Sequence, residues 1–139
     1  MRLAFLISGS GTTLANYLEK QKSLLITGEV VVVISSRKDA FGINYAKNAG
    51  IPYYIIEYKE YKNDIEKYSS EITNVLIANR VELVVMGGFL SFYKIPSQYE
   101  NRVINIHPAL SPSFSGKGMY GMKVHEAVFN SGVKYTGCT

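Results

Sequence analysis

The stretch that decides the fold is residues 29–35, which read Glu-Val-Val-Val-Val-Ile-Ser in a chain of 139 residues. Side chains on a strand alternate between its two faces, so a run of consecutive aliphatic residues places apolar groups on both of them. A strand that is apolar on both faces is typical of parallel sheets, which are covered by helices on each side. We therefore predict an α/β fold built around this strand.

Short apolar runs alternate with helical patterns on both sides of this stretch. Between the runs, apolar residues recur at spacings of three and four, which indicates helices. The further predicted strands are 2–8, 53–57, 83–86 and the run that begins at 102, and the predicted helices are one around Leu14 and those at 41–49, 63–79 and 121–131. This alternation predicts a doubly wound, mostly parallel, Rossmann-like sheet in a single domain, residues 1–139.

The composition limits the partners of the protein. Fifteen Lys and Arg residues against eleven Asp and Glu give a net charge of +4, but the basic residues are scattered and form no nucleic-acid-binding or membrane-binding run. No apolar stretch approaches the length of a membrane span, and Cys138 is the only cysteine, so no internal disulfide can form. We expect a cytoplasmic protein with small-molecule ligands, without nucleic-acid or membrane partners, as a monomer or a homodimer.

Residues 102–112 carry two polar side chains to the end of a strand. Val103, Asn105 and His107 share one strand face, and Pro108 lacks an N–H group and favours an extended backbone before it. The strand should therefore end at His107. Ligands of open α/β sheets bind at the carboxyl ends of the strands, so Asn105 and His107 are the candidate catalytic residues.

An amide beside an imidazole suits the transfer of a carbonyl group. The Asn105 amide can donate to an oxyanion that forms on an attacked carbonyl, and the His107 imidazole can move a proton between attacking and leaving groups. No nucleophile-elbow serine accompanies them, which indicates direct transfer between two bound substrates. Neither His107 nor His125, which we expect on the polar side of its helix, has metal-ligand spacing with Cys138 or an acid, so we expect no metal.

A glycine-rich turn at residues 8–14, Ser-Gly-Ser-Gly-Thr-Thr-Leu, opens the first predicted helix. Free backbone N–H groups at such a helix start favour an anion such as phosphate, although an ordinary tight turn explains the glycines equally well. Leu14 stands where a dinucleotide fingerprint needs its third glycine, which argues against NAD. Arg37 and Lys38, after the second strand, keep a non-catalytic NADP-binding module open as an alternative.

Four motifs in this order and spacing resemble the phosphoribosylglycinamide formyltransferases of purine synthesis. They are residues 8–14, Gly88-Phe89, Asn105-Ile106-His107-Pro108 and residues 124–128, and the resemblance extends over residues 1–139. The Asn-Ile-His-Pro motif is its most specific element. The resemblance implies a formyltransferase fold and transfer of a formyl group from the cosubstrate 10-formyltetrahydrofolate to the amine of glycinamide ribonucleotide.

The resemblance also implies roles for individual residues. Asn105 would stabilise the tetrahedral oxyanion, and His107 would act in proton transfer. The ribonucleotide phosphate would be held by the amides of Gly11, Thr12 and Thr13. The folate pteridine would lie in a pocket lined by Phe89, Leu90 and Phe92, and the loop after Pro108 would cover the ribonucleotide with a segment that includes Gly116 and Gly118.

Three positions depart from the family pattern. Thr13 stands where the family usually has asparagine, and residues 109–112 read Ala-Leu-Ser-Pro instead of Ser-Leu-Leu-Pro. The family aspartate that would help to orient the imidazole lies downstream of a strand that begins at residues 136–139, and this chain ends before it. We therefore expect a C-terminally incomplete record of a longer protein, without the last strands of the sheet. The alternative is a natural truncation, which we predict to be poorly active and marginally stable, with an unpaired sheet edge.

Related enzymes remain as alternatives within the same fold. They are the folate-dependent formyltransferases that act on methionyl-tRNA or on an amino sugar, and formyltetrahydrofolate hydrolase. The hydrolase usually has a second histidine where Pro108 stands. A tRNA substrate calls for a more concentrated basic surface than this sequence offers.

Overall fold

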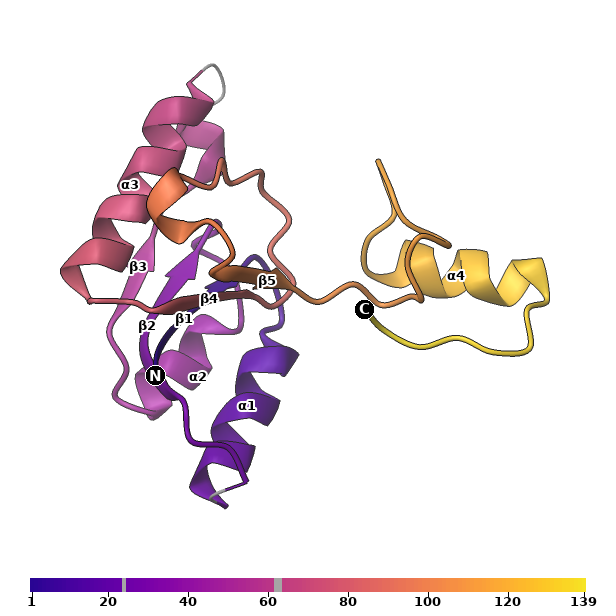
Figure 1. Ribbon diagram of the computed structural model, residues 1–139, viewed down its shortest axis with the longest axis horizontal. Coiled ribbons are helices and arrows are strands. Elements are labelled where there is room, and N and C mark those ends of the chain that lie inside the picture. Colours follow the sequence, from indigo (N-terminus) through magenta and orange to yellow (C-terminus); the bar gives the residue numbers. More distant parts are fainter. Residues whose placement is uncertain (24, 62–63) are drawn as a thin grey trace. The chain divides into compact units, whose positions relative to one another are not determined.

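The computed structural model describes residues 1–23, 25–61 and 64–139, in which strands and helices alternate along the chain (Figure 1). The strands are β1 (Arg2–Ile7), β2 (Glu29–Ser35), β3 (Tyr53–Ile55), β4 (Leu83–Met86) and β5 (Val103–Asn105). The α-helices are α1 (Thr12–Lys22), α2 (Ile43–Asn48), α3 (Ile65–Ala78) and α4 (Met122–Ser131). Two short 3₁₀ helices are η1 (Tyr58–Tyr61) and η2 (Ser97–Tyr99).

The strands form one sheet in the order β3-β2-β1-β4-β5. Strand β1 pairs in parallel with β2 on one side and with β4 on the other, and β2 pairs in parallel with β3. The strand order runs outward from β1 in both directions, which is the arrangement of a doubly wound sheet. The predicted α/β, Rossmann-like architecture is confirmed.

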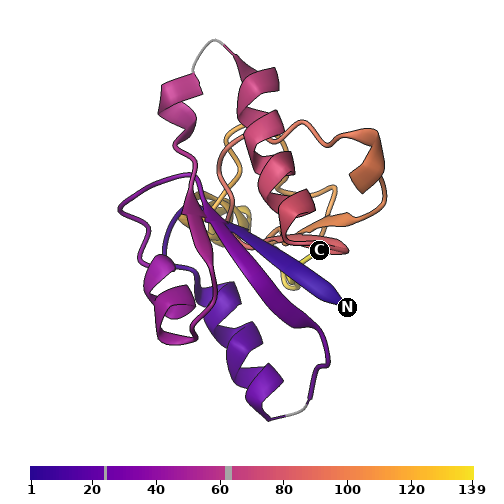
Figure 2. The ribbon, with the colours of Figure 1, turned by 90° about the vertical axis from the view of Figure 1, so that its left-hand side faces the viewer.

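Strand β1 lies between two hydrophobic layers. Its residues from Leu3 to Ile7 are at most 2% exposed. Ala4 and Leu6 belong to the core cluster that contains the buried residues of α3, whereas Phe5 and Ile7 belong to the cluster that contains those of α1 and α2. Figure 2 shows the same division, with α3 on one face of the sheet and α1 and α2 on the other. The period-two alternation of a strand thus produces both layers.

The boundaries of several elements differ from the prediction by one or two residues. The helix predicted over 63–79 begins at Ile65, because the Asp64 side chain caps it by accepting the Lys67 N–H at 2.8 Å; residue 63 lies outside the described residues. The strand predicted over 53–57 ends at Ile55, since the chain turns into η1 soon afterwards.

The chain forms two compact units, residues 1–104 and residues 105–139. The first unit contains β1 to β4 with α1, α2 and α3, and the second contains α4. The expectation of a single domain stays a prediction. Within the part of the chain that the structure describes, no helix is long and apolar enough to cross a membrane.

A tyrosine of α3 buries a hydroxyl group that has no hydrogen-bond partner among the described residues. Tyr68 is fully buried, and its ring packs edge-on against Tyr58 with 5.0 Å between the ring centroids. Burial raises the pKa of this hydroxyl to about 12, and the nearby Ser91 side chain, which lies outside hydrogen-bond geometry, lowers it only in part. Because an unpaired buried hydroxyl costs free energy, we predict that Tyr68→Phe raises the free energy of unfolding by about 1 kcal/mol, as measured by urea unfolding at neutral pH.

Tyr93→Phe is the matched control, because Tyr93 is also buried but its hydroxyl lies 3.0 Å from Thr73 Oγ1 in a hydrogen bond. It should lower the free energy of unfolding by about 1 kcal/mol. Equal destabilisation by the two variants would contradict this account.

The raised pKa of Tyr68 also predicts a pH dependence. In the unfolded protein the Tyr68 hydroxyl loses its proton near its ordinary pKa, at a lower pH than in the folded protein, so the parent should lose stability as the pH rises from about 10 to about 12. Tyr68→Phe should lose less stability over this range.

Candidate functional site

The turn between β1 and α1 leads directly into the backbone amides at the start of an 11-residue helix. Gly11 is the N-cap residue, with φ of 69° and ψ of 24°, and no side chain caps the helix. The Ala15 N–H donates to the Gly11 carbonyl at 2.9 Å, which starts the helical hydrogen bonding. The N–H groups of the preceding first turn, at Thr12 and Thr13, are the ones that a helix leaves for an anion.

Packing against α2 requires glycine at position 11. A Cβ atom on Gly11 would lie 2.5 Å from the Gly42 Cα, a distance that packed atoms do not reach. The Gly42 N–H also donates to the Gly9 carbonyl at 3.0 Å. Glycine therefore satisfies both the left-handed backbone and the close approach of two chain segments.

The segment after β4 lies against the same turn. The Ser8 N–H donates to the Gly88 carbonyl at 3.1 Å, and a Cβ atom on Gly87 would lie 3.1 Å from the Thr13 Cβ. The residues predicted to bind the phosphate, Gly11 to Thr13, are thus next to the segment predicted to bind the folate.

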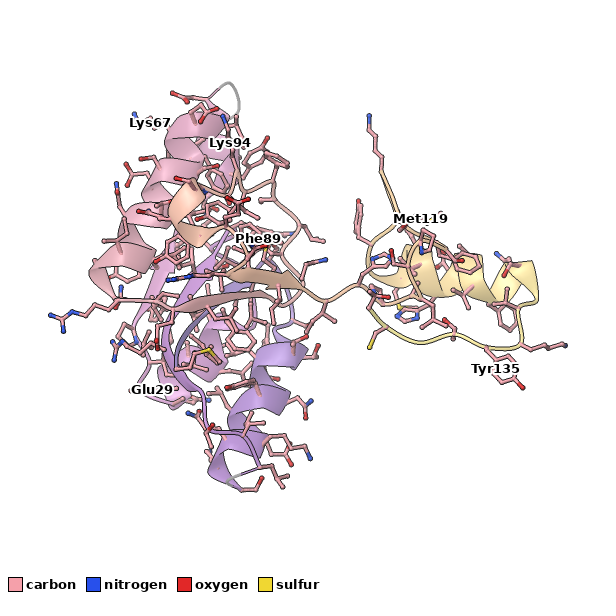
Figure 3. The ribbon with its side chains drawn as sticks, viewed as in Figure 1. Glu29, Lys67, Phe89, Lys94, Met119 and Tyr135 are labelled. Carbon is pink, nitrogen blue, oxygen red and sulfur yellow. The ribbon has the colours of Figure 1, made fainter. Side chains whose placement is uncertain are left out.

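The three predicted folate-pocket residues have different surroundings. Phe89 is only 9% exposed and belongs to the hydrophobic cluster that packs on α3, and Figure 3 shows it inside the first unit. Leu90 and Phe92 are 57% and 64% exposed. Leu90 and Phe92 therefore have apolar surface available to a ligand, while Phe89 anchors the segment to the core.

A cavity of about 470 Å³ lies at the carboxyl ends of β1, β2 and β3 beside the segment after β4. It is lined by residues that include Ser8, Arg37, Lys38, Glu57 and Leu90. The Arg37 guanidinium donates two hydrogen bonds to Asp39, of 3.0 and 2.6 Å. These bonds hold the pKa of the Asp39 carboxyl below its usual value. The Arg37–Asp39 pair is exposed on both sides and so competes only weakly with other anions; binding of the 2′-phosphate of NADP by Arg37 and Lys38 stays an alternative.

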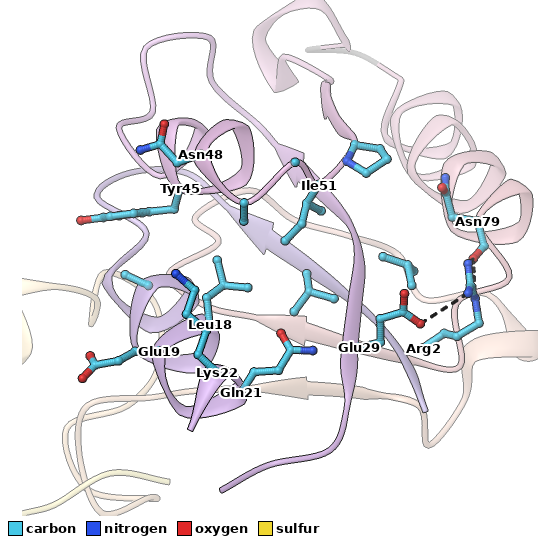
Figure 4. Close-up of a pocket in the computed structure, with 16 residues that line it drawn as sticks. Arg2, Leu18, Glu19, Gln21, Lys22, Glu29, Tyr45, Asn48, Ile51 and Asn79 are labelled. Carbon is cyan, nitrogen blue, oxygen red and sulfur yellow. Dashed lines mark hydrogen bonds and ion pairs between the residues drawn. The ribbon is translucent and has the colours of Figure 1, made fainter. Parts of the chain in front are cut away.

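A larger cavity, of about 980 Å³, lies at the opposite end of the strands, beside the first residues of β1 and β2 (Figure 4). At its border Arg2 donates two hydrogen bonds to the Asn79 carbonyl, of 3.2 and 3.1 Å, and lies 3.7 Å from the Glu29 carboxylate. None of the predicted site residues lines this cavity.

Asn105 and His107 belong to the second unit. Strand β5 ends at Asn105, so the prediction that the strand reaches His107 is wrong. The backbone of His107 pairs instead with Thr139, through bonds of 2.8 and 2.9 Å, and this pairing takes both its N–H and its carbonyl group. Asn105 is exposed and His107 is partly buried.

The His107 ring is oriented by the loop that follows it. Its Nε2 atom lies 2.9 Å from the Phe114 carbonyl oxygen. A carbonyl oxygen only accepts hydrogen bonds, so this geometry requires the proton on Nε2. The neutral imidazole then has its lone pair on Nδ1, which becomes the atom that can accept a proton. The loop predicted over 108–121, which contains Gly116 and Gly118, has no helix or strand.

The two other residues considered above as metal ligands, His125 and Cys138, are both exposed. For His125, which lies on α4, this exposure agrees with its predicted place on the polar side of the helix. Among residues 1–23, 25–61 and 64–139, no three His, Cys, Asp or Glu side chains gather in a way that could hold a metal ion.

Sequence reasoning missed a contact between two buried serines at the carboxyl ends of β1 and β2. The hydroxyl oxygens of Ser8 and Ser36 lie 2.6 Å apart in a hydrogen bond. Ser8 follows β1 and Ser36 follows β2. The available signal was a serine immediately after each of two neighbouring buried strands.

Residues 1–139 match the family model described as formyl transferase. The chain belongs to the formyl transferase family. Its resemblance to phosphoribosylglycinamide formyltransferases, inferred above from four motifs, is thereby confirmed at the level of the family and is supported by individual relatives.

Three relatives illustrate the similarity within the formyl transferase family. The chloroplastic phosphoribosylglycinamide formyltransferase of Arabidopsis thaliana is 35% identical over 140 residues, which cover 99% of this chain and 48% of that protein. The structure of glycinamide ribonucleotide transformylase 1 from Symbiobacterium toebii has a TM-score of 0.88 and 34% identity, covering 100% of this chain and 64% of the other. That of phosphoribosylglycinamide formyltransferase from Campylobacter jejuni has a TM-score of 0.84 and 33% identity, covering 99% and 71%. The chain thus spans about half the length of the Arabidopsis protein.

For this formyl transferase family member we predict that Gly11→Ala is strongly destabilising. The new Cβ would meet the Gly42 Cα at 2.5 Å, in a backbone conformation that L-residues rarely adopt. The left-handed conformation costs about 1 kcal/mol for alanine, and the clash adds about 1–3 kcal/mol. The free energy of unfolding, measured by urea denaturation, should fall by the sum of both.

Gly50→Ala separates the two costs. Gly50 has a φ of +67°, close to that of Gly11, but a Cβ atom there would meet nothing within 4 Å. This variant should lose only about 1 kcal/mol, the conformational cost. If both variants lost the same amount, the close approach of Gly11 to Gly42 would not matter for stability.

Proposed function

We propose that the protein transfers the formyl group of 10-formyltetrahydrofolate to the amine of glycinamide ribonucleotide, a reaction of purine synthesis. The observation that supports this most directly is the family match over residues 1–139, together with relatives of 35% and 33% identity that are named phosphoribosylglycinamide formyltransferase. The proposed ligands are small molecules, and the proposed location is the cytoplasm.

The proposed phosphate site consists of the backbone amides of Gly11, Thr12 and Thr13. The start of α1 supports it, because an uncapped helix N-terminus offers N–H groups and a partial positive charge to an anion. Thr13 replaces the asparagine that is usual in the family, and its Cβ lies close to Gly87. A phosphate held by backbone amides does not depend on that side chain.

The proposed folate site lies along the segment after β4. A pteridine ring is flat and needs apolar surface on at least one side. Leu90 and Phe92 offer exposed apolar side chains, and the buried Phe89 side chain fixes the segment that carries them. We propose that the pteridine contacts this segment, with Leu90 and Phe92 as the contacting side chains.

The proposed chemistry is direct transfer. The amine nitrogen of the ribonucleotide attacks the formyl carbon, and the carbonyl oxygen becomes an oxyanion that accepts a hydrogen bond from the Asn105 amide group. His107 takes the proton that the attacking nitrogen must lose, and the tautomer with a free Nδ1 lone pair supports this role. The bond from the formyl carbon to the folate nitrogen then breaks, and that nitrogen leaves with the electron pair and a proton.

Replacing the imidazole tests this proposal. In the complete protein, we expect His107→Ala to lower kcat by about 10²–10⁴-fold, because the proton transfer loses its carrier. The affinity for glycinamide ribonucleotide should stay within about twofold, since the phosphate is bound elsewhere. Steady-state formyl transfer and isothermal titration calorimetry measure the two quantities.

His125→Ala is the matched control, because it removes the other histidine of the chain, which is exposed on α4. Its kcat should equal that of the parent. Unchanged turnover in His107→Ala would remove His107 from the mechanism, and a parent that transfers no formyl group to the ribonucleotide would overturn the proposed function itself.

A further inference from the structure

The Ser8 side chain connects two segments that the proposed reaction needs. Ser8 is 2% exposed, and its hydroxyl oxygen accepts the Leu90 N–H at 2.8 Å. The same oxygen lies 2.6 Å from the Ser36 hydroxyl oxygen. Through its backbone, Ser8 also donates to the Gly88 carbonyl at 3.1 Å. One buried residue thus binds the segment after β4 twice.

This network joins the carboxyl ends of three neighbouring strands. Ser8 follows β1, Ser36 follows β2, and Leu90 lies in the segment after β4. The Ser36 N–H donates to the Ile7 carbonyl at 3.1 Å, which keeps Ser36 beside the end of β1. The Ser8 hydroxyl is therefore held in place from one side and binds Leu90 on the other.

The segment after β4 has few other constraints at Leu90. The Leu90 side chain is largely exposed, so packing does not fix it, and the segment is neither helix nor strand. Around Leu90 its anchors are the Phe89 side chain in the core and two bonds to Ser8, one to the Ser8 backbone and one to the Ser8 hydroxyl. The chain is held again after Phe92, by the buried Tyr93 and by the Lys94 N–H. Loss of the Ser8 hydroxyl would leave the Leu90 N–H unpaired and free the chain that carries Leu90 and Phe92.

We propose that the Ser8 hydroxyl is a positioning group that orders the 88–92 segment for the folate cosubstrate. This inference rests on the proposed function. It gives the Ser8 side chain a role separate from the phosphate binding proposed for the backbone amides of the same turn. Ser8 is only 2% exposed, so we assign its effect to its bond with the Leu90 N–H, although Ser8, Ser36 and Leu90 also line the 470 Å³ cavity. The expected consequence is a selective effect: the KM for the folate depends on Ser8 more than the KM for the ribonucleotide does.

Ser8→Ala in the complete protein tests the proposal with two readouts. Hydrogen–deuterium exchange without substrate should become about tenfold faster at residues 88–92, because their main side-chain acceptor is lost. The KM for 10-formyltetrahydrofolate should rise by about tenfold, whereas kcat at saturating folate and the KM for the ribonucleotide should stay within about twofold.

Ser69→Ala is the matched control. Ser69 is also buried, and its hydroxyl oxygen also accepts a backbone N–H, that of Lys94 at 3.0 Å, two residues beyond the 88–92 segment. It lies on α3, away from the three strand ends. This variant should change neither KM. A Ser8→Ala protein with normal exchange at residues 88–92, or with both KM values raised to the same extent, would overturn the proposal.

Two further outcomes are also decisive. An inactive parent would overturn the proposed function and this inference with it, whereas an active parent with an unchanged folate KM in Ser8→Ala would overturn this inference alone. If Ser8→Ala does not fold, Ser8→Cys replaces the hydroxyl by a weaker acceptor. Its exchange at residues 88–92 and its folate KM should both exceed those of the parent, and parental values of either would contradict the proposal.

Discussion

The burial of β1 on both faces is the constraint on which the rest of the structure depends. Residues Leu3 to Ile7 are almost entirely inaccessible, with α3 packed on one face and α1 and α2 on the other. The turn that follows β1 must therefore pass close to both α1 and the start of α2. Gly11 meets that demand against Gly42, and α1 then starts at the carboxyl edge of the sheet with its first amides uncapped.

Backbone groups and side chains have different tasks in this architecture. The proposed phosphate site uses backbone amides, which most substitutions preserve. The 88–92 segment is attached both by a backbone bond from Ser8 to Gly88 and by the Ser8 hydroxyl. Phosphate binding by backbone amides explains how Thr13 can replace the usual asparagine in a member of the formyl transferase family. The proposed chemistry depends instead on two side chains, Asn105 and His107. Within the second unit, the ring of His107 is oriented by a backbone carbonyl of its own loop.

Local patterns predicted the elements that a single physical rule determines. The aliphatic run at residues 29–35 and the periodic stripe of α3 gave the correct secondary structure, since burial alone fixes both. Pro108 predicted a strand that reaches His107, whereas β5 ends at Asn105. The sequence around Pro108 could not show this, because the His107 backbone is hydrogen-bonded to Thr139, 32 residues further along the chain. The bond between Leu90 and Ser8 joins residues 82 positions apart, and no local pattern records it. The burial of Phe89 likewise depends on α3, which packs over it.

The most direct test of the central claim follows the backbone amides of the complete, isotopically labelled protein by NMR during ligand addition. Glycinamide ribonucleotide should shift the amide signals of Gly11, Thr12 and Thr13 in a saturable manner, and NADPH at the same concentration should leave them in place. Unchanged amide signals at these three positions, or saturable NADPH-induced shifts at Arg37 and Lys38, would show that the carboxyl edge of this sheet binds a different ligand.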